Sequence, residues 1–332
     1  MLDDRKAVIL HALVQEYIHT AQPVGSSRLS GSPGVEVSSA TVRSELASLE
    51  DQEYLVQPHT SAGRIPTVKA YRFFVDQVQD RTPILEESHS QQVRDFFFDE
   101  HDGLSSLLSH TARLLSELTD WAGVVVGPSS AQVVVRLAQL IKVSTQKVLV
   151  LAVMSNGSVE KRVLDLPQGA TADVVADASQ RLAEKVIGCT LSEVEVEYGS
   201  TADETDRLVI AALDALHEAS EHHRVFVGGT GKLADAFDAA DQLRAVLSLL
   251  EHQLTVVSLV QELLDRDCRV AIGVENGVPS LSECAVVLAP YSAYGTDFGT
   301  IGVIGPTRMD YHKVISAVDV VGQQLGSALS QA

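Results

Sequence analysis

The chain has 332 residues, of which 45% are hydrophobic and 21% charged, a composition that excludes an intrinsically disordered protein. Its length predicts two or three domains, each large enough to bury a core. No apolar run approaches the roughly 18 residues of a transmembrane helix, and the early acids Asp3 and Asp4 argue against a signal peptide. Three cysteines, far apart and odd in number, favour a reducing compartment over a disulfide framework. We therefore expect a cytoplasmic protein that does not associate with a membrane.

The net charge of −19 is unevenly distributed along the chain. Residues 1–79 carry seven Lys and Arg against nine Asp and Glu, whereas the rest of the chain carries 18 against 35. A strongly acidic body repels nucleic acid and anionic membrane surfaces. A polyanionic partner would therefore have to be bound by a local basic patch in the N-terminal part.

Three helices are predicted in that N-terminal part. The first follows an N-cap at Asp3 or Asp4, the second is short and lies near residues 26–29, and the third begins after Ser38, a good N-cap residue. The first helix has an apolar stripe at i, i+3, i+4 and i+7, formed by Leu10, Leu13, Val14 and Tyr17. A strand at residues 54–56, a Gly/Pro-punctuated loop or hairpin at residues 57–67 and a further helix after Thr67 follow.

This order of elements is that of a winged helix-turn-helix, in which one helix enters the major groove of DNA. The helix after Ser38 places small and hydrogen-bonding residues on its outward face near its start. The candidates for DNA contact are Ser39, Ala40, Thr41, Arg43 and Ser44. Arg43 could bind a guanine edge or a phosphate, and the sequence does not distinguish the two. A plain three-helix packing module, with the serines acting only as caps, fits the same pattern.

The hairpin would supply the wing. Between Tyr54 and Val75 the chain has three basic residues, Arg64, Lys69 and Arg72, and no acid. The candidate wing contacts are His59, Thr60, Arg64 and Lys69. Gly63 is expected to let the backbone approach the duplex closely.

The rest of the chain alternates between sheet and helix. A helix at residues 103–118 is followed by strands from 124 to 166, which include a hairpin around residues 155–158. Residues 170–265 are mainly helical, with two short strands expected at 194–198 and 224–227. Further strands are expected at residues 269–274, 284–289 and 299–304, before a final helix at 307–329. Pro306 should end the last strand and Thr307 should cap the final helix, although Arg308 and Asp310 could instead organise an interface.

Sheet segments separated by a mostly helical stretch indicate an α+β domain with a second module inserted in it. The expected limits are 1–80 for the DNA-binding domain and 81–103 for a linker. The α+β domain would comprise residues 104–167 and 266–332, with the inserted module at 168–265.

Three segments resemble catalytic or ligand-binding motifs but lack essential residues. The segment 225–232 ends in Gly231-Lys232 like a phosphate loop, yet Phe226 stands where glycine is needed. His217 begins a zinc-protease-like pattern without its second histidine, and the acids at residues 203–206 fit a helix N-terminus. We therefore predict no enzyme, no cofactor and no metal site.

Two long runs of residues resemble one known family. In the N-terminal part they are residues 23–26, 37–43 (Val-Ser-Ser-Ala-Thr-Val-Arg), 49–50, 53–55, 57–67 and 71–72. In the C-terminal part they are residues 272–276, 289–291 and 299–311 (Gly-Thr-Ile-Gly-Val-Ile-Gly-Pro-Thr-Arg-Met-Asp-Tyr). With these segments the chain resembles the heat-inducible transcription repressor HrcA family.

The resemblance implies a protomer made of a winged-helix domain, a GAF-like domain and a dimerising module inserted in the latter. It implies a homodimeric repressor whose operator is an inverted repeat, the CIRCE element, upstream of chaperone operons. It also implies that the GroE chaperonin keeps the repressor active, and that heat diverts the chaperonin and releases transcription.

Two departures from the family pattern change individual expectations. Ser44 stands where asparagine is common, which weakens a predicted amide-to-adenine contact. Residues 68–70 read Val-Lys-Ala where acid-Lys-Gly is usual, so a positive φ at Ala70 is not expected and the turn should be helical.

Two alternative functions are compatible with the same domains. One is a winged-helix regulator that senses a small effector in its GAF-like domain, although no ligand-anchoring constellation is visible. The other is an enzyme with a DNA-binding appendage, which would need a Gly/Arg-rich adenylate loop that the chain lacks.

Overall fold

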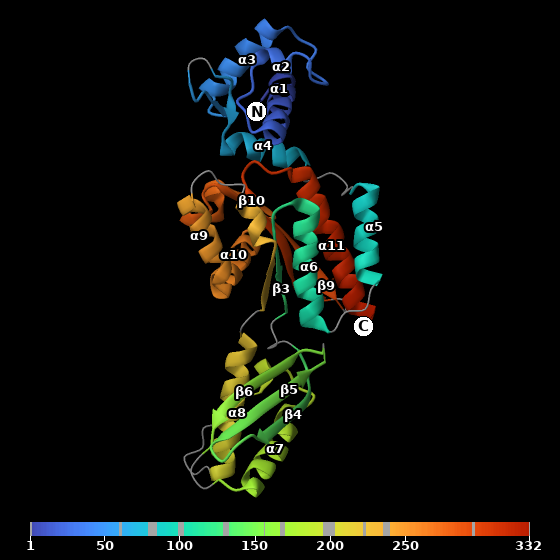
Figure 1. Ribbon diagram of the computed structural model, residues 1–332, viewed down its shortest axis with the longest axis vertical. Helices are drawn as coiled ribbons and strands as arrows, with labels where there is room; N and C mark the ends of the chain where they lie inside the picture. The colour runs from blue at the N-terminus through green and yellow to red at the C-terminus, as the bar shows by residue number, and fades with distance from the viewer. Residues whose placement is uncertain are drawn as a thin grey trace. The chain divides into compact units, whose positions relative to one another are not determined.

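The computed structural model has a mixed α/β fold with several sheets (Figure 1). It describes residues 2–59, 62–78, 85–98, 103–128, 133–155, 157–166, 170–194, 203–221, 224–234, 240–293 and 296–331. The chain divides into two compact units. The first unit comprises residues 1–99, 111–125 and 227–332, and the second comprises 100–110 and 126–226.

The first unit begins with the three expected helices, α1 (Asp4–Thr20), α2 (Ser26–Leu29) and α3 (Ser39–Asp51). Two side chains provide the predicted caps: Asp3 accepts a hydrogen bond from the backbone N–H of Lys6, and Ser38 accepts one from that of Thr41. The backbone N–H of Lys6, aided by its ammonium group, holds the pKa of Asp3 below its usual value. The apolar stripe of α1 is buried, except that Tyr17 is half-buried.

A short hairpin and a fourth helix follow α3. Strands β1 (Leu55–Val56) and β2 (Ile65–Pro66) pair antiparallel, with Leu55 opposite Pro66 and Val56 opposite Ile65. Helix α4 (Val68–Val78) begins directly after β2, so the segment around Ala70 is helical, as the sequence predicts. The predicted order of helices, hairpin and helix is therefore confirmed.

A five-stranded sheet forms the centre of the first unit. Its strands are β3 (Ala122–Val126), β7 (Val225–Gly228), β8 (Val270–Ile272), β9 (Cys284–Ala293) and β10 (Thr296–Pro306), in the spatial order β7-β3-β10-β9-β8. Strand β9 pairs antiparallel with both β8 and β10. The helices around the sheet are α5 (Glu87–Phe98), α6 (Leu104–Thr119), α9 (Ala240–Glu251), α10 (Gln253–Asp265) and α11 (Tyr311–Gln331). Helix α11 packs against β9 and β10, and α5 packs against α11 (Figure 1).

The expected cap of the final helix was wrong by three residues. Strand β10 ends at Pro306 as predicted, but Thr307 lies in a turn, where its carbonyl oxygen accepts a hydrogen bond from the Tyr311 hydroxyl at 2.6 Å. Asp310 caps α11 instead, and its Oδ1 accepts from the backbone N–H of Lys313 at 3.0 Å. Thr307 is unavailable because its own N–H pairs with the Glu283 carbonyl and holds it beside the sheet.

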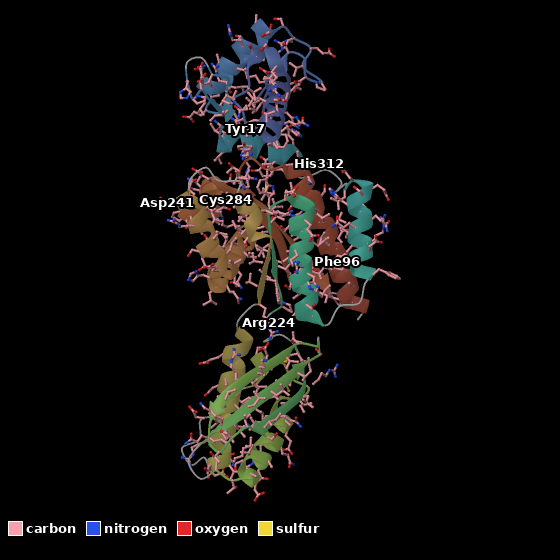
Figure 2. All side chains as sticks on the ribbon, viewed as in Figure 1. Tyr17, Phe96, Arg224, Asp241, Cys284 and His312 are labelled. Atoms are coloured by element: carbon pink, nitrogen blue, oxygen red, sulfur yellow. The ribbon has the colours of Figure 1, made fainter. Side chains whose placement is uncertain are left out.

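The second unit is built on a three-stranded antiparallel sheet, β4 (Val135–Lys142), β5 (Lys147–Met154) and β6 (Val159–Asp165), in that order. The predicted hairpin is the β5–β6 pair. Helices α7 (Ala172–Val186) and α8 (Glu204–Glu221) pack against this sheet and share one hydrophobic core with it. Figure 2 labels Arg224, which binds the buried Glu160 carboxylate at 3.0 Å and also donates to Ser105 at 3.1 Å.

The two compact units have different limits from the expected domains. Strands β4 to β6 group with α7 and α8, whereas we expected them in the α+β domain. Helices α9 and α10 group with the first unit, whereas they were assigned to the inserted module. The physical reason is strand pairing, since β4, β5 and β6 pair with one another and their buried face needs the helices that follow. The strand expected at 194–198 lies almost entirely outside the described residues.

No single helix among the described residues is both long and apolar enough to cross a bilayer. Only α9 and α10 taken together reach that length and hydropathy, and the pair is bent by 90°.

Candidate DNA-binding surface

The outward face of α3 has the small and polar character that the sequence predicts. Ala40, Arg43 and Ser44 are exposed, because Val42, Leu46 and Leu49 occupy the opposite, buried face. Ala47 continues the exposed face by one turn. Small side chains beside a long cation leave room for the helix to approach a surface closely.

Ser39 and Thr41 lie at the start of α3 and are half-buried. Ser39 Oγ is 3.1 Å from Ser26 Oγ at the start of α2, and Thr41 Oγ1 is 3.0 Å from Ser38 Oγ. The Ser39 hydroxyl therefore helps to join α2 to α3, and the Thr41 hydroxyl helps to order the first turn of α3. The structure brings all five predicted α3 residues to one end of the helix. The hydroxyl groups of Ser39 and Thr41 are already hydrogen-bonded within the protein.

Arg43 differs from the other lysines and arginines in this part of the molecule. Among the described residues up to 78, it is the only lysine or arginine without an ion pair or side-chain hydrogen bond. It is exposed and lies between Ala40 and Ala47 on the helix surface. Its full positive charge is therefore available to an external anion.

Other basic side chains of α1 and α2 form ion pairs with acids of neighbouring helices. Arg5 and Lys6 both reach Glu45 of α3, at 3.7 and 3.6 Å, and Arg28 of α2 binds Glu16 of α1 at 2.5 Å. These pairs tie the three helices to one another.

Arg64, a predicted wing contact, is held by an acid of α3. Its Nε and Nη2 both lie 2.8 Å from Glu50 Oε2, and its side chain is only 18% exposed. Its backbone N–H and carbonyl also pair with Val24, which joins the hairpin to the loop between α1 and α2. The structure therefore places Arg64 where it fastens the hairpin to the helices, and not as a free cation.

Gly63 is needed for a close contact within the protein itself. A Cβ atom at Gly63 would lie 2.5 Å from the carbonyl carbon and oxygen of Val24. A glycine is required at this position because two segments of the protein's own backbone approach each other closely. This contact is sufficient to explain the glycine, whether or not DNA also approaches it.

The remaining wing candidates are more accessible. Lys69 is exposed, with its Nζ donating to the Gln52 carbonyl at 2.9 Å and lying 4.6 Å from the centroid of the Tyr54 ring. His59 is exposed near the tip of the hairpin. Thr60 lies outside the described residues.

Arg72, the third basic residue of this segment, pairs with Glu275, which is 203 residues further along the chain.

The glycine-rich segment after β7 packs against α6. Cβ atoms at Gly228 and Gly229 would lie 2.6 Å from the Ala112 backbone and 1.6 Å from Ser116 Oγ. Lys232 donates to Asp120 and to the Ser116 carbonyl, both at 3.0 Å, and its hydrogen bond holds the pKa of Asp120 below the usual value. These contacts account for a motif that resembled a phosphate loop. Among the described residues, no group of three or more His, Cys, Asp or Glu is placed to hold a metal ion.

Known proteins similar to this chain identify its family. A family model described as the HrcA protein C-terminal domain matches residues 105–315. A heat-inducible transcription repressor HrcA of Carboxydothermus hydrogenoformans is 32% identical over 338 residues, covering 99% of this chain and 98% of the relative. The chain belongs to the HrcA family. The HrcA of Acidothermus cellulolyticus is 36% identical over 341 residues and is matched over its full length.

The HrcA family is one of transcription repressors and not of enzymes. A solved structure also shares the fold of the chain. It is described as a crystal structure of a hypothetical protein at 2.2 Å resolution, and it is 22% identical with a TM-score of 0.68. The match covers 100% of this chain and 99% of that one, so it supports the mixed α/β fold over the full length.

Proposed function

We propose that this HrcA-family protein is a repressor of chaperone operons that binds an inverted-repeat CIRCE operator as a homodimer in the cytoplasm. Helix α3 enters the major groove, and the β1–β2 hairpin forms the wing of a winged helix-turn-helix. The observation that carries the proposal is Arg43, an exposed cation without a protein partner among the described residues. The names of its relatives, heat-inducible transcription repressors, point to the same activity.

The surface around Arg43 fits a groove better than it fits a protein core. Ala40 and Ser44 lie within one turn of Arg43, and short side chains let a helix backbone approach base edges. Arg43 can then bind a guanine through two parallel hydrogen bonds or bind one phosphate. Ser39 and Thr41 support this geometry through their contacts at the start of α3, and His59, Thr60 and Lys69 are assigned to the wing.

Dimer formation is supported by an exposed apolar face in the second unit. On the outer face of its sheet, Leu137 and Val159 flank Val153, and Ile141 and Val163 flank Leu149. The four flanking side chains are 39–58% exposed. An apolar sheet face of this kind commonly marks a protein–protein contact. We assign it to the dimer contact, which moves the proposed dimerising surface from residues 168–265 to strands β4 to β6.

A two-fold dimer presents two copies of α3, and an inverted repeat presents two matching half-sites. The proposed regulation follows from the family resemblance. The GroE chaperonin keeps the repressor competent, and heat removes it by occupying the chaperonin with unfolded protein. No small-molecule effector is part of this proposal.

The decisive experiment is a titration of an operator duplex and a scrambled duplex at two salt concentrations, with and without chaperonin. The slope of affinity against salt reports phosphate contacts, and the operator-to-scrambled ratio reports specificity. The wild type should prefer the operator, and Arg43→Ala should lose affinity for it. Arg244→Ala provides a matched control, because Arg244 is an exposed arginine on α9 that pairs only locally with Asp241 at 3.3 Å. Equal binding of both duplexes by the wild type would contradict the proposal.

A further inference from the structure

Helix α4 has neighbours in two parts of the first unit. On one side it packs against α1, where Phe74 lies 4.7 Å from the His11 ring, centroid to centroid. On the other side it packs against β8 and α11, where Tyr71 lies 6.0 Å from the Tyr311 ring. Because α3 packs against α1, the position of α3 relative to the five-stranded sheet depends on how α4 is held.

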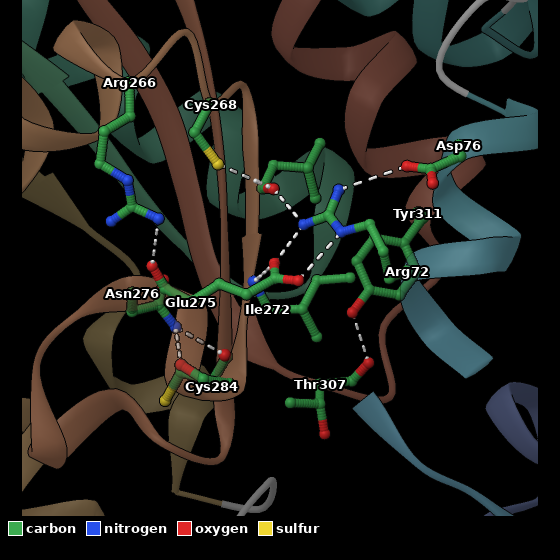
Figure 3. A network of polar contacts seen from close by, with 12 residues as sticks. Arg72, Asp76, Arg266, Cys268, Ile272, Glu275, Asn276, Cys284, Thr307 and Tyr311 are labelled. Atoms are coloured by element: carbon green, nitrogen blue, oxygen red, sulfur yellow. Dashed lines mark hydrogen bonds and ion pairs between the residues drawn. The ribbon is translucent and has the colours of Figure 1, made fainter. Parts of the chain in front are cut away.

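Arg72 makes the polar contacts that hold α4 to the sheet (Figure 3). Its Nε donates to Glu275 Oε1 at 3.1 Å, and its Nη2 donates to Glu275 Oε2 and to the Val270 carbonyl, the latter at 2.6 Å. Burial alone lowers the pKa of a guanidinium, yet the pKa of Arg72 is raised because Glu275 accepts its hydrogen bonds and lies beside it with the opposite charge. Asp76, on α4 itself, is a weaker partner at 3.6 Å.

Glu275 is itself held by hydrogen bonds from neighbouring residues. Its Oε2 accepts from the backbone N–H of Ile272 at 2.9 Å, and its carbonyl accepts from Arg266 at 3.1 Å (Figure 3). Glu275 lies in a short 3-10 helix, Gly273–Asn276, whose first residue, Gly273, has a φ of +59°. A Cβ at Gly273 would lie 3.0 Å from Val68 of α4. A bidentate arginine between two ordered backbones restrains both direction and distance, which a single point charge does not.

We propose that the Arg72–Glu275 pair is a positioning device for operator recognition, which sets the orientation of α3 so that the two copies in a dimer meet both half-sites. This inference rests on the proposed function. Neither side chain is assigned to the DNA surface, so their effect is on geometry. If α4 can rotate, each α3 still fits one half-site. The second α3 of the dimer is then less often placed at the second half-site, so its effective concentration there falls. The gain in affinity from binding both half-sites at once is therefore lost.

The test uses the full-length protein and duplexes with one half-site, with the natural inverted repeat, and with the spacer lengthened or shortened by one base pair. For Glu275→Gln and Arg72→Ala we expect about tenfold weaker binding to the natural repeat. Affinity for the single half-site should remain at the wild-type level. The loss of affinity that an altered spacer causes should be smaller than in the wild type. Arg72→Lys, which retains the charge but not the bidentate geometry, should fall between these variants and the wild type.

Asp76→Asn is the matched control, because it removes a carboxylate from the same arginine without touching the sheet. It should behave like the wild type on every duplex. Equal losses on half-site and full repeat would overturn the inference, since they would show that the pair only maintains the folded N-terminal part. An unchanged spacer penalty in Glu275→Gln and Arg72→Ala would overturn it as well. A wild type that binds operator and scrambled duplex equally would instead refute the proposed function, and the positioning role with it.

Discussion

Arg43 on α3 and Arg64 on the β1–β2 hairpin are both arginines in the N-terminal part, and the sequence predicts DNA contact for both. In the fold, Arg43 is exposed without a partner among the described residues, whereas Arg64 is bound by Glu50 and mostly buried. A cation that is already paired gains less from a phosphate, because a new contact must replace an existing one. Arg43 therefore leaves its positive charge exposed on α3, whereas Arg64 uses its charge to fasten the hairpin to α3.

The largest effect is expected from Gly63→Ala in the hairpin. Its new methyl group would meet the Val24 backbone, so the free energy of unfolding of the N-terminal part should fall by about 3 kcal/mol. Hydrogen exchange of the α1 and α3 amides measures this local opening. Gly31→Ala is the control, because a Cβ at Gly31 has no neighbour within 4 Å and stability should change by less than about 1 kcal/mol. Unchanged exchange in Gly63→Ala would show that the hairpin is not fastened at Val24.

Arg43→Ala should cost about 1–3 kcal/mol of operator binding free energy and leave stability unchanged. If Arg43 reads a base, the loss is confined to operators carrying that base. If it binds phosphate, all duplexes should weaken together and the salt slope should fall by about one. Titration of a set of single-base operator variants separates these outcomes. Wild-type affinity for every duplex would remove Arg43 from the proposed surface.

Arg64→Ala should act in the opposite way, lowering stability more than DNA affinity. Loss of the charged hydrogen bonds to Glu50 should cost about 1–2 kcal/mol of unfolding free energy. Glu50→Gln should cause a similar loss, and the double variant should lose less than the sum of the two. Denaturation and DNA titration of the three variants at low temperature provide the measurement. A reduced salt slope in Arg64→Ala but not in Glu50→Gln would show that Arg64 also contacts phosphate.

The smallest effect is expected from Lys69→Ala. Its contacts with the Tyr54 ring and the Gln52 carbonyl are exposed, so stability should fall by less than about 1 kcal/mol. Its contribution to DNA binding should appear only as a modest decrease in salt slope. A loss as large as that of Arg43→Ala would mean that the hairpin, and not α3, carries the main charge contact.

Much of the fold could be predicted because its signals are local. The caps at Asp3 and Ser38, the β5–β6 hairpin and the end of β10 at Pro306 each depend on a few adjacent residues. The cap of α11 was misplaced because Thr307 and Asp310 are both good cap residues, and a contact with the distant Glu283 removes the first. The exposed face of α3 could be predicted from helical periodicity. Which arginines form ion pairs within the protein could not be predicted, because their partners are brought close only by folding.

The amino-acid sequence by itself determined the mixed α/β class, the order of the N-terminal elements and the family. Only the tertiary structure decided that Arg43 has no partner among the described residues while Arg64 and Arg72 each bind a glutamate. It also decided that Gly63 contacts Val24 and that β4 to β6 group with α7 and α8. The physical reason is the range of the interactions. Caps and turns are satisfied within a few residues, whereas the partner of Arg72 lies 203 residues away and is brought to it only by the folded sheet.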